Sequence, residues 1–392
     1  MKITSVKGTN DYLPNEVEIR DYLQERILSV YKENGFEHII TPAIEDIENL
    51  DKSDGGENLN LIFKIMKRGD KLDKALASGV TAANENELAD MGLRYDLTLP
   101  LSRYYANNKD KLTLPMKCIQ IDRVYRAERP QKGRLREFIQ CDIDIIGSES
   151  TDSEIELILT TTKALDAIGL KNYKVKLNDR RLLRAVLQSF GFAENDLDSV
   201  CITFDKMDKI GLTGVVEELT EKGFAKDAVD NFEKFLSEGD FTLESLKSRL
   251  EDKTPAESLE HIIDTGTVFE VESIDFKGAV AGGGRYDHLI GKFLNEDIPA
   301  VGFSIGFERI FGILMNNGIS IEQRADKIAV VYEDGQLKDA VKAADALRAQ
   351  GKIASLYIKP KKLGKFLNKL EERGYDGFLN VGVSEEVSMF EK

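Results

Sequence analysis

The stretch that decides the fold is Val124–Gly147, VYRAERPQKGRLREFIQCDIDIIG. Two runs rich in strand-forming residues, Val124–Arg129 and Glu137–Ile146, flank a polar and basic segment that contains a proline and a glycine. Strand-like runs separated by such a segment are typical of a β-hairpin. We therefore predict two antiparallel strands joined by a loop over Pro130–Arg136.

The hairpin is rich in cationic side chains, and six of them lie close together in the sequence: Arg123, Arg126, Arg129, Lys132, Arg134 and Arg136. An arginine held on a sheet presents a planar fork of N–H donors, which forms strong charge-assisted hydrogen bonds with phosphate oxygens. A phosphate-binding surface is one interpretation of this pattern, and a solvated, charged hairpin fits it equally well.

Polar residues occupy every second position of the returning strand, at Gln140, Asp142 and Asp144. Alternate residues of a strand point to the same face of its sheet, so these three side chains share a face. In a strand that is otherwise apolar, this pattern indicates the lining of a cavity, and a face open to solvent is the alternative.

The rest of the chain supplies further elements around this hairpin. Apolar residues at helical spacing predict a helix over Glu16–Lys32, followed by an extended segment at residues 36–42. Acidic, mostly helical sequence predicts an inserted helical domain at about 178–262. A strand is predicted at Phe276–Ala281. The glycines of Gly282–Gly284 after it fit a close approach of the backbone to a ligand or another strand, and a tight turn explains them equally well.

The C-terminal sequence has a different pattern. Ala300–Ser304 predicts a strand and Phe307–Met315 a helix. From Ile328 to Val381 the pattern then alternates strand, helix, strand, helix and strand, which is typical of a small α/β domain.

Composition limits the class of protein. Hydrophobic residues make up 42% of the 392 residues and charged residues 31%, as in soluble globular proteins. No apolar run approaches the roughly 18–20 residues that cross a bilayer. Cys118, Cys141 and Cys201 are few and lack zinc-site spacing, which is typical of reduced thiols in a cytosolic protein. We therefore predict a cytoplasmic protein with no membrane partner. Because the net charge is −15, binding of RNA would have to use local basic patches.

Seven segments, in order, resemble the histidyl-tRNA synthetase family of class II aminoacyl-tRNA synthetases. They are Lys7–Pro14, Gly35–Pro42 (similar to motif 1), Arg94–Thr98, Tyr125–Asp144 (similar to motif 2), Ala281–Asp287, Pro299–Phe303 and Gly306–Arg309 (both similar to motif 3). The resemblance covers nearly the whole chain.

This resemblance implies an α/β protein with an α+β catalytic core, built on the class II antiparallel sheet flanked by helices. The core is expected to span residues 1–320, with the helical insertion at about 178–262. Residues 327–392 are expected to form a small α/β domain that resembles an anticodon-binding domain and is shortened. Because motif 1 builds a dimer interface in this class, the resemblance also implies a homodimer.

The same resemblance implies roles for individual residues. Arg126 and Arg309 are the expected catalytic residues, gripping the α- and γ-phosphates of ATP. The residues expected to bind ATP are Arg126, Glu128, Arg134, Phe138, Glu308 and Arg309. Those expected to bind histidine are Asp96, Thr98, Gln140, Asp144 and Tyr286. Arg129 and Gln131 are expected to touch the acceptor end of the tRNA, and no residue is assigned to a metal.

The implied activity is that of a histidine–tRNA ligase. Histidine and ATP, with Mg²⁺ bridging the phosphates, give histidyl-adenylate, and the histidyl group then passes to tRNA(His). The sequence departs from the family at Leu259–Asp264, before Thr265, where an arginine-glycine element and paired tyrosines are expected. Two alternatives therefore stay open: a catalytically weak paralogue that acts as a regulatory subunit of ATP phosphoribosyltransferase in histidine biosynthesis, and a binding protein that keeps only the fold.

Overall fold

The structure is a computed structural model. It describes residues 3–52, 58–79, 87–131, 133–176, 180–239, 242–250, 252–257, 270–274, 278–294, 296–318 and 325–390. The chain forms two compact units, Met1–Asn10 with Gln24–Asn316 and Asp11–Leu23 with Asn317–Lys392. Among the helices in these residues, none has the length and apolar character needed to cross a membrane.

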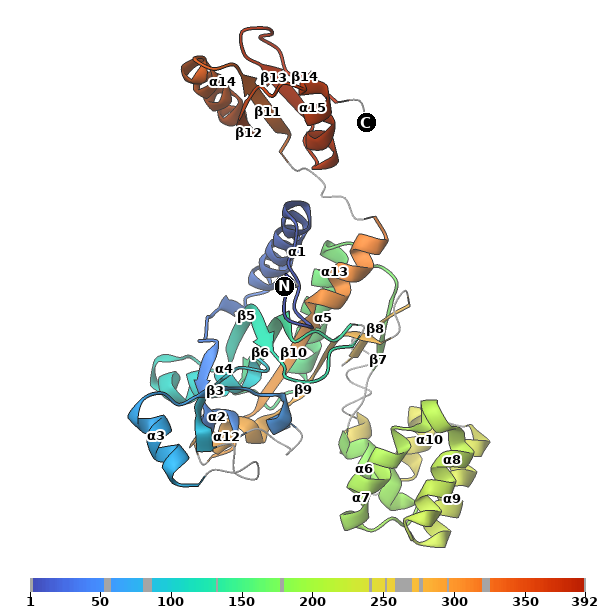
Figure 1. Ribbon diagram of the computed structural model, residues 1–392. Helices are drawn as coiled ribbons and strands as arrows, with labels where there is room; N and C mark the ends of the chain where they lie inside the picture. The colour runs from blue at the N-terminus through green and yellow to red at the C-terminus, as the bar shows by residue number, and fades with distance from the viewer. Residues whose placement is uncertain are drawn as a thin grey trace. The chain divides into compact units, whose positions relative to one another are not determined.

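The larger unit is built on a seven-stranded sheet (Figure 1). In spatial order its strands are β1 (Glu37–His38), β5 (Met116–Tyr125), β6 (Glu137–Ile146), β10 (Ala300–Gly306), β9 (Ala279–Arg285), β8 (Glu270–Ser273) and β7 (Tyr173–Lys176). Neighbouring strands run antiparallel except for β1 and β5, which are parallel. The predicted antiparallel sheet is therefore confirmed.

Helices from several parts of the chain accompany this sheet (Figure 1). Helix α5 (Asp152–Ala167) packs against β10, and α13 (Phe307–Asn316) packs against β6 and β9. Helix α4 (Thr98–Asn108) contacts α12 (Asp287–Leu294), and α1 (Pro14–Glu33) precedes β1. Together with α4 and α12, the central strands β6, β9 and β10 carry the candidate site described below.

One predicted boundary was wrong, and one of the two interpretations of the glycine run is excluded. The first strand of the hairpin ends at Tyr125 and not at Arg129, because the backbone N–H of Ala127 turns away to donate to the carbonyl of Leu61. The glycines of Gly282–Gly284 do not form a turn. They lie inside β9, opposite residues Gly302–Ser304 of β10.

A smaller antiparallel sheet lies between β1 and β5 in the sequence. Its strands, in order, are β2 (Ile44–Asp46), β4 (Ala89–Leu93) and β3 (Phe63–Met66), accompanied by α2 (Ile47–Leu50), α3 (Asp70–Ala77) and the 3₁₀ helices η1 (Asn58–Leu61) and η3 (Lys109–Lys111). Leu50 and Ile62 are buried in a cluster with Tyr95 and Leu99, so this sheet is packed close to the start of α4.

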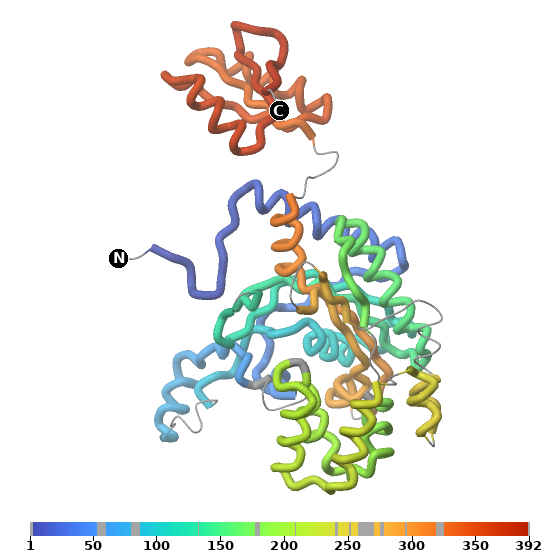
Figure 2. Tube along the Cα trace, turned by 90° about the vertical axis from the view of Figure 1, so that its right-hand side faces the viewer, coloured from blue at the N-terminus to red at the C-terminus, as the bar shows by residue number. Residues whose placement is uncertain are grey.

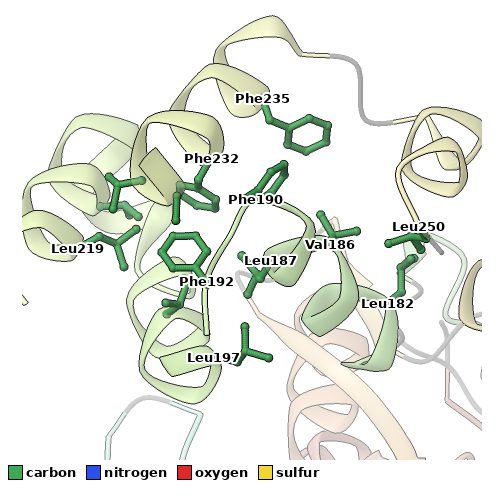
Figure 3. Packing of buried hydrophobic residues seen from close by; sticks show 14 of the residues in the cluster. Leu182, Val186, Leu187, Phe190, Phe192, Leu197, Leu219, Phe232, Phe235 and Leu250 are labelled. Carbon is green, nitrogen blue, oxygen red and sulfur yellow. The ribbon is translucent and has the colours of Figure 1, made fainter. Parts of the chain in front are cut away.

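A set of helices between β7 and β8 has a hydrophobic core of its own. Its elements are α6 (Arg180–Ser189), η4 (Glu194–Asp196), α7 (Leu197–Phe204), α8 (Met207–Glu221), α9 (Lys226–Glu238) and α10 (Leu243–Ser248). The ring of Phe232 meets those of Phe190 and Phe192 edge to face, at centroid distances of 6.2 Å (Figure 3). Aromatic and aliphatic burial of this kind holds short helices that would be marginal alone.

The smaller unit contains the C-terminal α/β segment, which is orange to red in Figure 2. Its elements are β11 (Lys327–Tyr332), α14 (Leu337–Ala349), β12 (Ile353–Ile358), α15 (Leu363–Glu372), β13 (Gly377–Asn380) and β14 (Ser388–Met389). The sheet order is β12-β11-β13-β14, with β14 antiparallel to its neighbour and the rest parallel. The alternation predicted for residues 328–381 is confirmed, and β14 is a fourth strand that was not predicted.

Candidate active site

A cavity of about 270 Å³ lies over the central strands of the main sheet. The strands β6, β9 and β10, the start of α4 and helix α12 contribute its walls. The lining residues are Tyr95, Asp96, Thr98, Gln140, Asp142, Asp144, Gly282, Gly283, Gly284, Tyr286, Leu289, Gly302, Phe303 and Ser304. The polar face predicted for the returning strand therefore lines a cavity and does not face bulk solvent.

Glycines keep the floor of this cavity open. A Cβ on Gly302 would lie 2.0 Å from Asp144 Oδ1, a distance that no real Cβ contact allows. A Cβ on Gly282 or Gly284 would meet no atom within 4 Å, so a side chain at either position would begin in open space. Glycine at these positions gives a ligand access to the backbone and to the carboxylate of Asp144.

Asp144 is a buried acceptor that lines the cavity and is only 3% exposed. Its Oδ1 atom accepts a hydrogen bond of 2.7 Å from the hydroxyl of Tyr286, while its Oδ2 atom has no partner. Burial raises the pKa of Asp144 to about 7, against the opposing effect of the Tyr286 hydrogen bond. A buried acceptor without a partner carries a desolvation cost that a ligand N–H removes.

Gln140 and Asp142 lie on the same strand and meet Ser304 of β10. Gln140 Nε2 donates to Ser304 Oγ over 3.0 Å, and the Ser304 hydroxyl donates to Asp142 Oδ1. The remaining amide atom, Gln140 Oε1, is buried without a partner. Two residues that line the cavity, Gln140 and Asp144, therefore each have a buried acceptor atom without a partner.

The start of α4 supplies the other end of the cavity. Asp96 Oδ1 accepts from the backbone N–H of Leu99 over 3.1 Å, which fixes the carboxylate at the helix N-terminus. Burial raises the pKa of Asp96, and the Leu99 N–H and the charge of Arg126 oppose that rise. Thr98 lines the cavity beside it.

Arg126 connects the cavity with a cationic region. Its Nε donates to the carbonyl of Tyr95 over 3.0 Å, and its guanidinium carbon lies 4.9 Å from the centroid of the Phe138 ring. The charge of Arg126 lowers the pKa of both Asp96 and Asp142. Arg126 is therefore close enough to act on groups in the cavity and on a ligand outside it.

The cationic region includes Arg309 and Arg134. Arg309 donates through one terminal nitrogen to the carbonyl of Ala279 and through Nε, over 3.4 Å, to that of Gly133. Burial lowers the pKa of Arg309, and the charges of Arg134 and Arg126 lower it further. The charges of Arg126 and Arg134 thus destabilise the charged form of Arg309, an arrangement that a polyanion such as a phosphate chain would stabilise.

Two glutamates lie among these arginines. Glu128 forms an ion pair of 3.4 Å with the exposed Arg134. Glu308 Oε1 accepts from the backbone N–H of Ile139 over 3.4 Å. Within the residues that the structure describes, no cluster of three His, Cys, Asp or Glu side chains is placed to hold a metal ion.

The loop of the hairpin includes Arg134 of the cationic region, and the N-terminal segment contacts the base of the loop. Arg129 and Gln131 are exposed. The backbone N–H of Arg136 donates to the carbonyl of Gly8 over 2.7 Å, and a Cβ on Gly8 would lie 2.9 Å from Pro130. Gly8, which has a φ of +91°, therefore permits a close approach that anchors the base of the loop.

Comparison with known proteins identifies the family that carries this site. The family model for histidyl-tRNA synthetase matches residues 8–264 and 254–310. The chain belongs to the histidyl-tRNA synthetase family. Among similar relatives, the histidine–tRNA ligase of Leifsonia xyli subsp. xyli is 37% identical over 417 residues, covering 96% of this chain and 94% of the relative. That of Christiangramia forsetii is 33% identical over 411 residues, covering 94% of this chain and 89% of the relative.

Solved structures show the same fold. The histidyl-tRNA synthetase from Nostoc sp. PCC 7120 has a TM-score of 0.77 at 24% identity and covers 96% of this chain and 91% of its own. A protein from Bacillus halodurans C, described as an ATP phosphoribosyltransferase regulatory subunit/histidyl-tRNA synthetase, has a TM-score of 0.76 at 18% identity and covers 97% and 98%. These matches establish the class II fold.

The structure of this synthetase-family chain places the predicted residues in two groups. The five expected at histidine all line the cavity: Asp96, Thr98, Gln140, Asp144 and Tyr286. Those expected at ATP lie on or beside the hairpin and at the start of α13: Arg126, Glu128, Arg134, Phe138, Glu308 and Arg309. Leu259–Asp264 and Thr265, where the sequence departs from the family, lie outside the described residues, as does Lys132.

Sequence reasoning missed two members of the site. Ser304 was assigned only to a strand, and Asp142 was placed on the polar face without a role. Ser304 lies between the apolar residues Phe303 and Ile305, so its nearest neighbours do not distinguish it. The available signal was the alternation of Gly302, Ser304 and Gly306, which puts one small or polar face opposite Gln140, Asp142 and Asp144.

Proposed function

We propose that this chain is an active histidine–tRNA ligase. The carboxylate of histidine attacks the α-phosphorus of ATP, the bond to pyrophosphate breaks, and histidyl-adenylate forms. The histidyl group then passes to the 3′ end of tRNA(His), releasing AMP. The observation that carries this proposal is a cavity with two unpaired buried acceptors, Gln140 Oε1 and Asp144 Oδ2, next to a group of arginines.

Histidine fits the chemistry of the cavity. We propose that Asp144 Oδ2 accepts from an imidazole N–H, with Tyr286 holding the carboxylate through its other oxygen. At the opposite end, Asp96, Thr98 and Gln140 would bind the amino and carboxylate groups. A buried pocket with unpaired polar groups rejects analogues that cannot pair with them, since the desolvation cost then remains.

ATP fits the cationic region beside the cavity. Arg126 would bind the α-phosphate and stabilise the charge that develops during attack, while Arg309 and Arg134 would bind the phosphates beyond it. Since Arg126 covers one face of Phe138, we propose that adenine stacks on the other face. Glu128 would accept from the adenine amino group, and Glu308 supports the strand that carries Phe138 through Ile139.

The remaining partners follow from the family. We propose that Mg²⁺ arrives with ATP, bound to its phosphate oxygens, and that the exposed Arg129 and Gln131 contact the acceptor end of tRNA(His). We further propose a cytoplasmic homodimer that uses the segment at residues 35–42, a catalytic core over residues 1–320 with its helical insertion, and an anticodon-binding-like domain at 327–392. The oligomeric state is testable by light scattering.

The decisive experiment is histidine-dependent ATP–pyrophosphate exchange. The wild-type protein is expected to be active, and Arg126→Ala is expected to lower the exchange rate by 100-fold or more, in the range seen when one transition-state donor is removed. Arg123→Ala is the matched control, because this exposed arginine lies on the same strand and pairs with Glu137 outside the cavity. Full activity of Arg126→Ala would remove this residue from the site.

The regulatory alternative is tested by the same protein. Its support is the departure from the family at Leu259–Asp264. A regulatory subunit would bind histidine without histidine-dependent exchange, and it would change the activity of added ATP phosphoribosyltransferase. Exchange by the wild-type protein together with no effect on that enzyme would exclude the alternative.

A further inference from the structure

Three side chains form a hydrogen-bonded chain along one wall of the cavity. Gln140 and Asp142 lie on β6, and Ser304 lies directly opposite Asp142 on β10. Gln140 Nε2 donates to Ser304 Oγ over 3.0 Å, and Ser304 in turn donates to Asp142 Oδ1. Asp142 is only 4% exposed, so this chain of bonds ends at a buried carboxylate.

The direction of this chain follows from the number of protons available. A carboxylate oxygen only accepts, and a serine hydroxyl has one proton to give. Because Ser304 donates its proton to Asp142, it can only accept from Gln140. The amide of Gln140 must therefore turn its NH₂ group to Ser304, which leaves Oε1 on the opposite side, where it is buried without a partner.

Two contacts of Asp142 favour this direction, against a net pKa that burial holds well above the ordinary value. Burial and the charge of Asp144 raise the pKa of Asp142, whereas the hydrogen bond from Ser304 lowers it. Donation from Ser304 therefore favours the accepting form of the carboxylate. Arg126 also lowers the pKa of Asp142, so a cation of the proposed ATP site helps to keep the end of the chain an acceptor.

We propose that Asp142 and Ser304 are positioning residues that fix the orientation of the Gln140 amide, so that the cavity presents Oε1 and not Nε2 to the α-ammonium group of the amino-acid substrate. This inference rests on the proposed function. Together with the carboxylate of Asp96, a fixed Oε1 makes this end of the cavity a set of acceptors. A flipped amide would place N–H donors against the ammonium group and leave both unpaired.

The test separates amine recognition from the general shape of the pocket. Ser304→Ala removes the fixed proton direction with little change in volume. We expect its KM for histidine in pyrophosphate exchange to rise roughly 10- to 100-fold, the range for losing a hydrogen bond to a charged group. The KM for ATP is expected to stay unchanged. The inhibition constant of 3-(imidazol-4-yl)propionate, which is histidine without its amino group, is also expected to stay within about twofold.

Three further variants make the result specific. In a Gln140→Ala background, Ser304→Ala is expected to have no additional effect, because Ser304 acts only through that amide. Asp142→Asn replaces a carboxylate acceptor by a group that can also donate. It is expected to raise the KM for histidine by a smaller factor than Ser304→Ala and to leave the other constants unchanged. Ser153→Ala, which removes the hydroxyl of another buried serine that bonds to Ser148, is the control and should leave all constants unchanged.

The outcomes distinguish this inference from the proposed function. Absence of exchange in the wild-type protein would reject the function itself, and calorimetric affinities for histidine and its deaminated analogue would then test the inference in place of the KM values. With an active wild-type protein, equal weakening of histidine and the deaminated analogue by Ser304→Ala or Asp142→Asn would overturn the inference, because the change would then lie in the pocket as a whole. Additive effects of Ser304→Ala and Gln140→Ala would also overturn it.

Discussion

Asp144→Asn tests two properties of the cavity, its effect on the unfolding free energy and its affinity for histidine. Asparagine has almost the same shape as aspartate, and its Oδ1 can still accept from the hydroxyl of Tyr286. What changes is the charge, because the amide does not titrate. In the wild-type protein the carboxyl is buried, has an unpaired Oδ2 and has a pKa of about 7 in place of the ordinary 3.8.

The raised pKa fixes the sign of the effect on stability. Between about pH 4 and pH 7 the folded state holds the proton of Asp144 more tightly than the unfolded chain does. The resulting stabilisation is fully present below the unfolded pKa and is lost as the pH rises through about 7. Going from pH 5.5 to pH 8, the wild-type protein loses about 2 kcal/mol from this group, since each pKa unit corresponds to 1.36 kcal/mol.

Asparagine lacks this titration, so the unfolding free energy of Asp144→Asn relative to wild type should be about 2 kcal/mol higher at pH 8 than at pH 5.5. Amide hydrogen exchange of peptides from β6, the strand that carries Asp144, measures this difference in unfolding free energy. Asp110→Asn, which changes an exposed carboxylate in the same unit, is the control.

The same variant should bind histidine more weakly, because a neutral amide replaces the carboxylate proposed to face the imidazole. We expect the KM for histidine to rise about tenfold or more, as for loss of a charge-assisted hydrogen bond, with little change in the KM for ATP. A stability difference that is equal at pH 5.5 and pH 8 would refute the titration of Asp144 in this window. Equal losses for histidine and ATP would refute its place at the imidazole.

Three other substitutions probe separate parts of the site. Gly302→Ala would place a Cβ 2.0 Å from Asp144 Oδ1, so it should abolish histidine binding in calorimetry, and retained affinity would contradict the described floor of the cavity. Phe138→Ala should raise the KM for ATP roughly tenfold through loss of stacking, and an unchanged value would place adenine elsewhere. Arg129→Ala should leave pyrophosphate exchange intact but lower the rate of tRNA charging, and a parallel loss in both assays would argue against a contact with tRNA alone.

Much of the fold was predictable because its signals are local. The hairpin follows from two strand-like runs around a basic loop, and both strands are present in the expected order. The small α/β segment was predictable for the same reason, since strand and helix periodicities alternate there without ambiguity. Tyr125 as the last residue of β5 was not predictable, because the chain leaves the strand for a contact with Leu61, which is distant in sequence.

The triple glycine shows how a local signal can leave two interpretations open. Three successive glycines usually mark a turn, since glycine reaches backbone conformations that other residues avoid. Here the glycines of Gly282–Gly284 are in a strand because β10 pairs with them in register. Their smallness serves the cavity and not a turn, and only the position of the partner strand reveals this.

The hardest property to predict was the burial of Asp96, Asp142 and Asp144 in one place. Each carboxyl has a raised pKa for which burial is the largest cause, so its charged form is destabilised where the proposed substrate binds. The sequence shows only that the residues alternate or recur. The sheet brings them together, and the charge of Arg126, from the proposed ATP site, lowers the pKa of two of them. A cation of the proposed ATP site thus helps to keep the acceptors of the proposed histidine site charged. Because of this coupling, we expect the binding of ATP and the binding of histidine to influence each other.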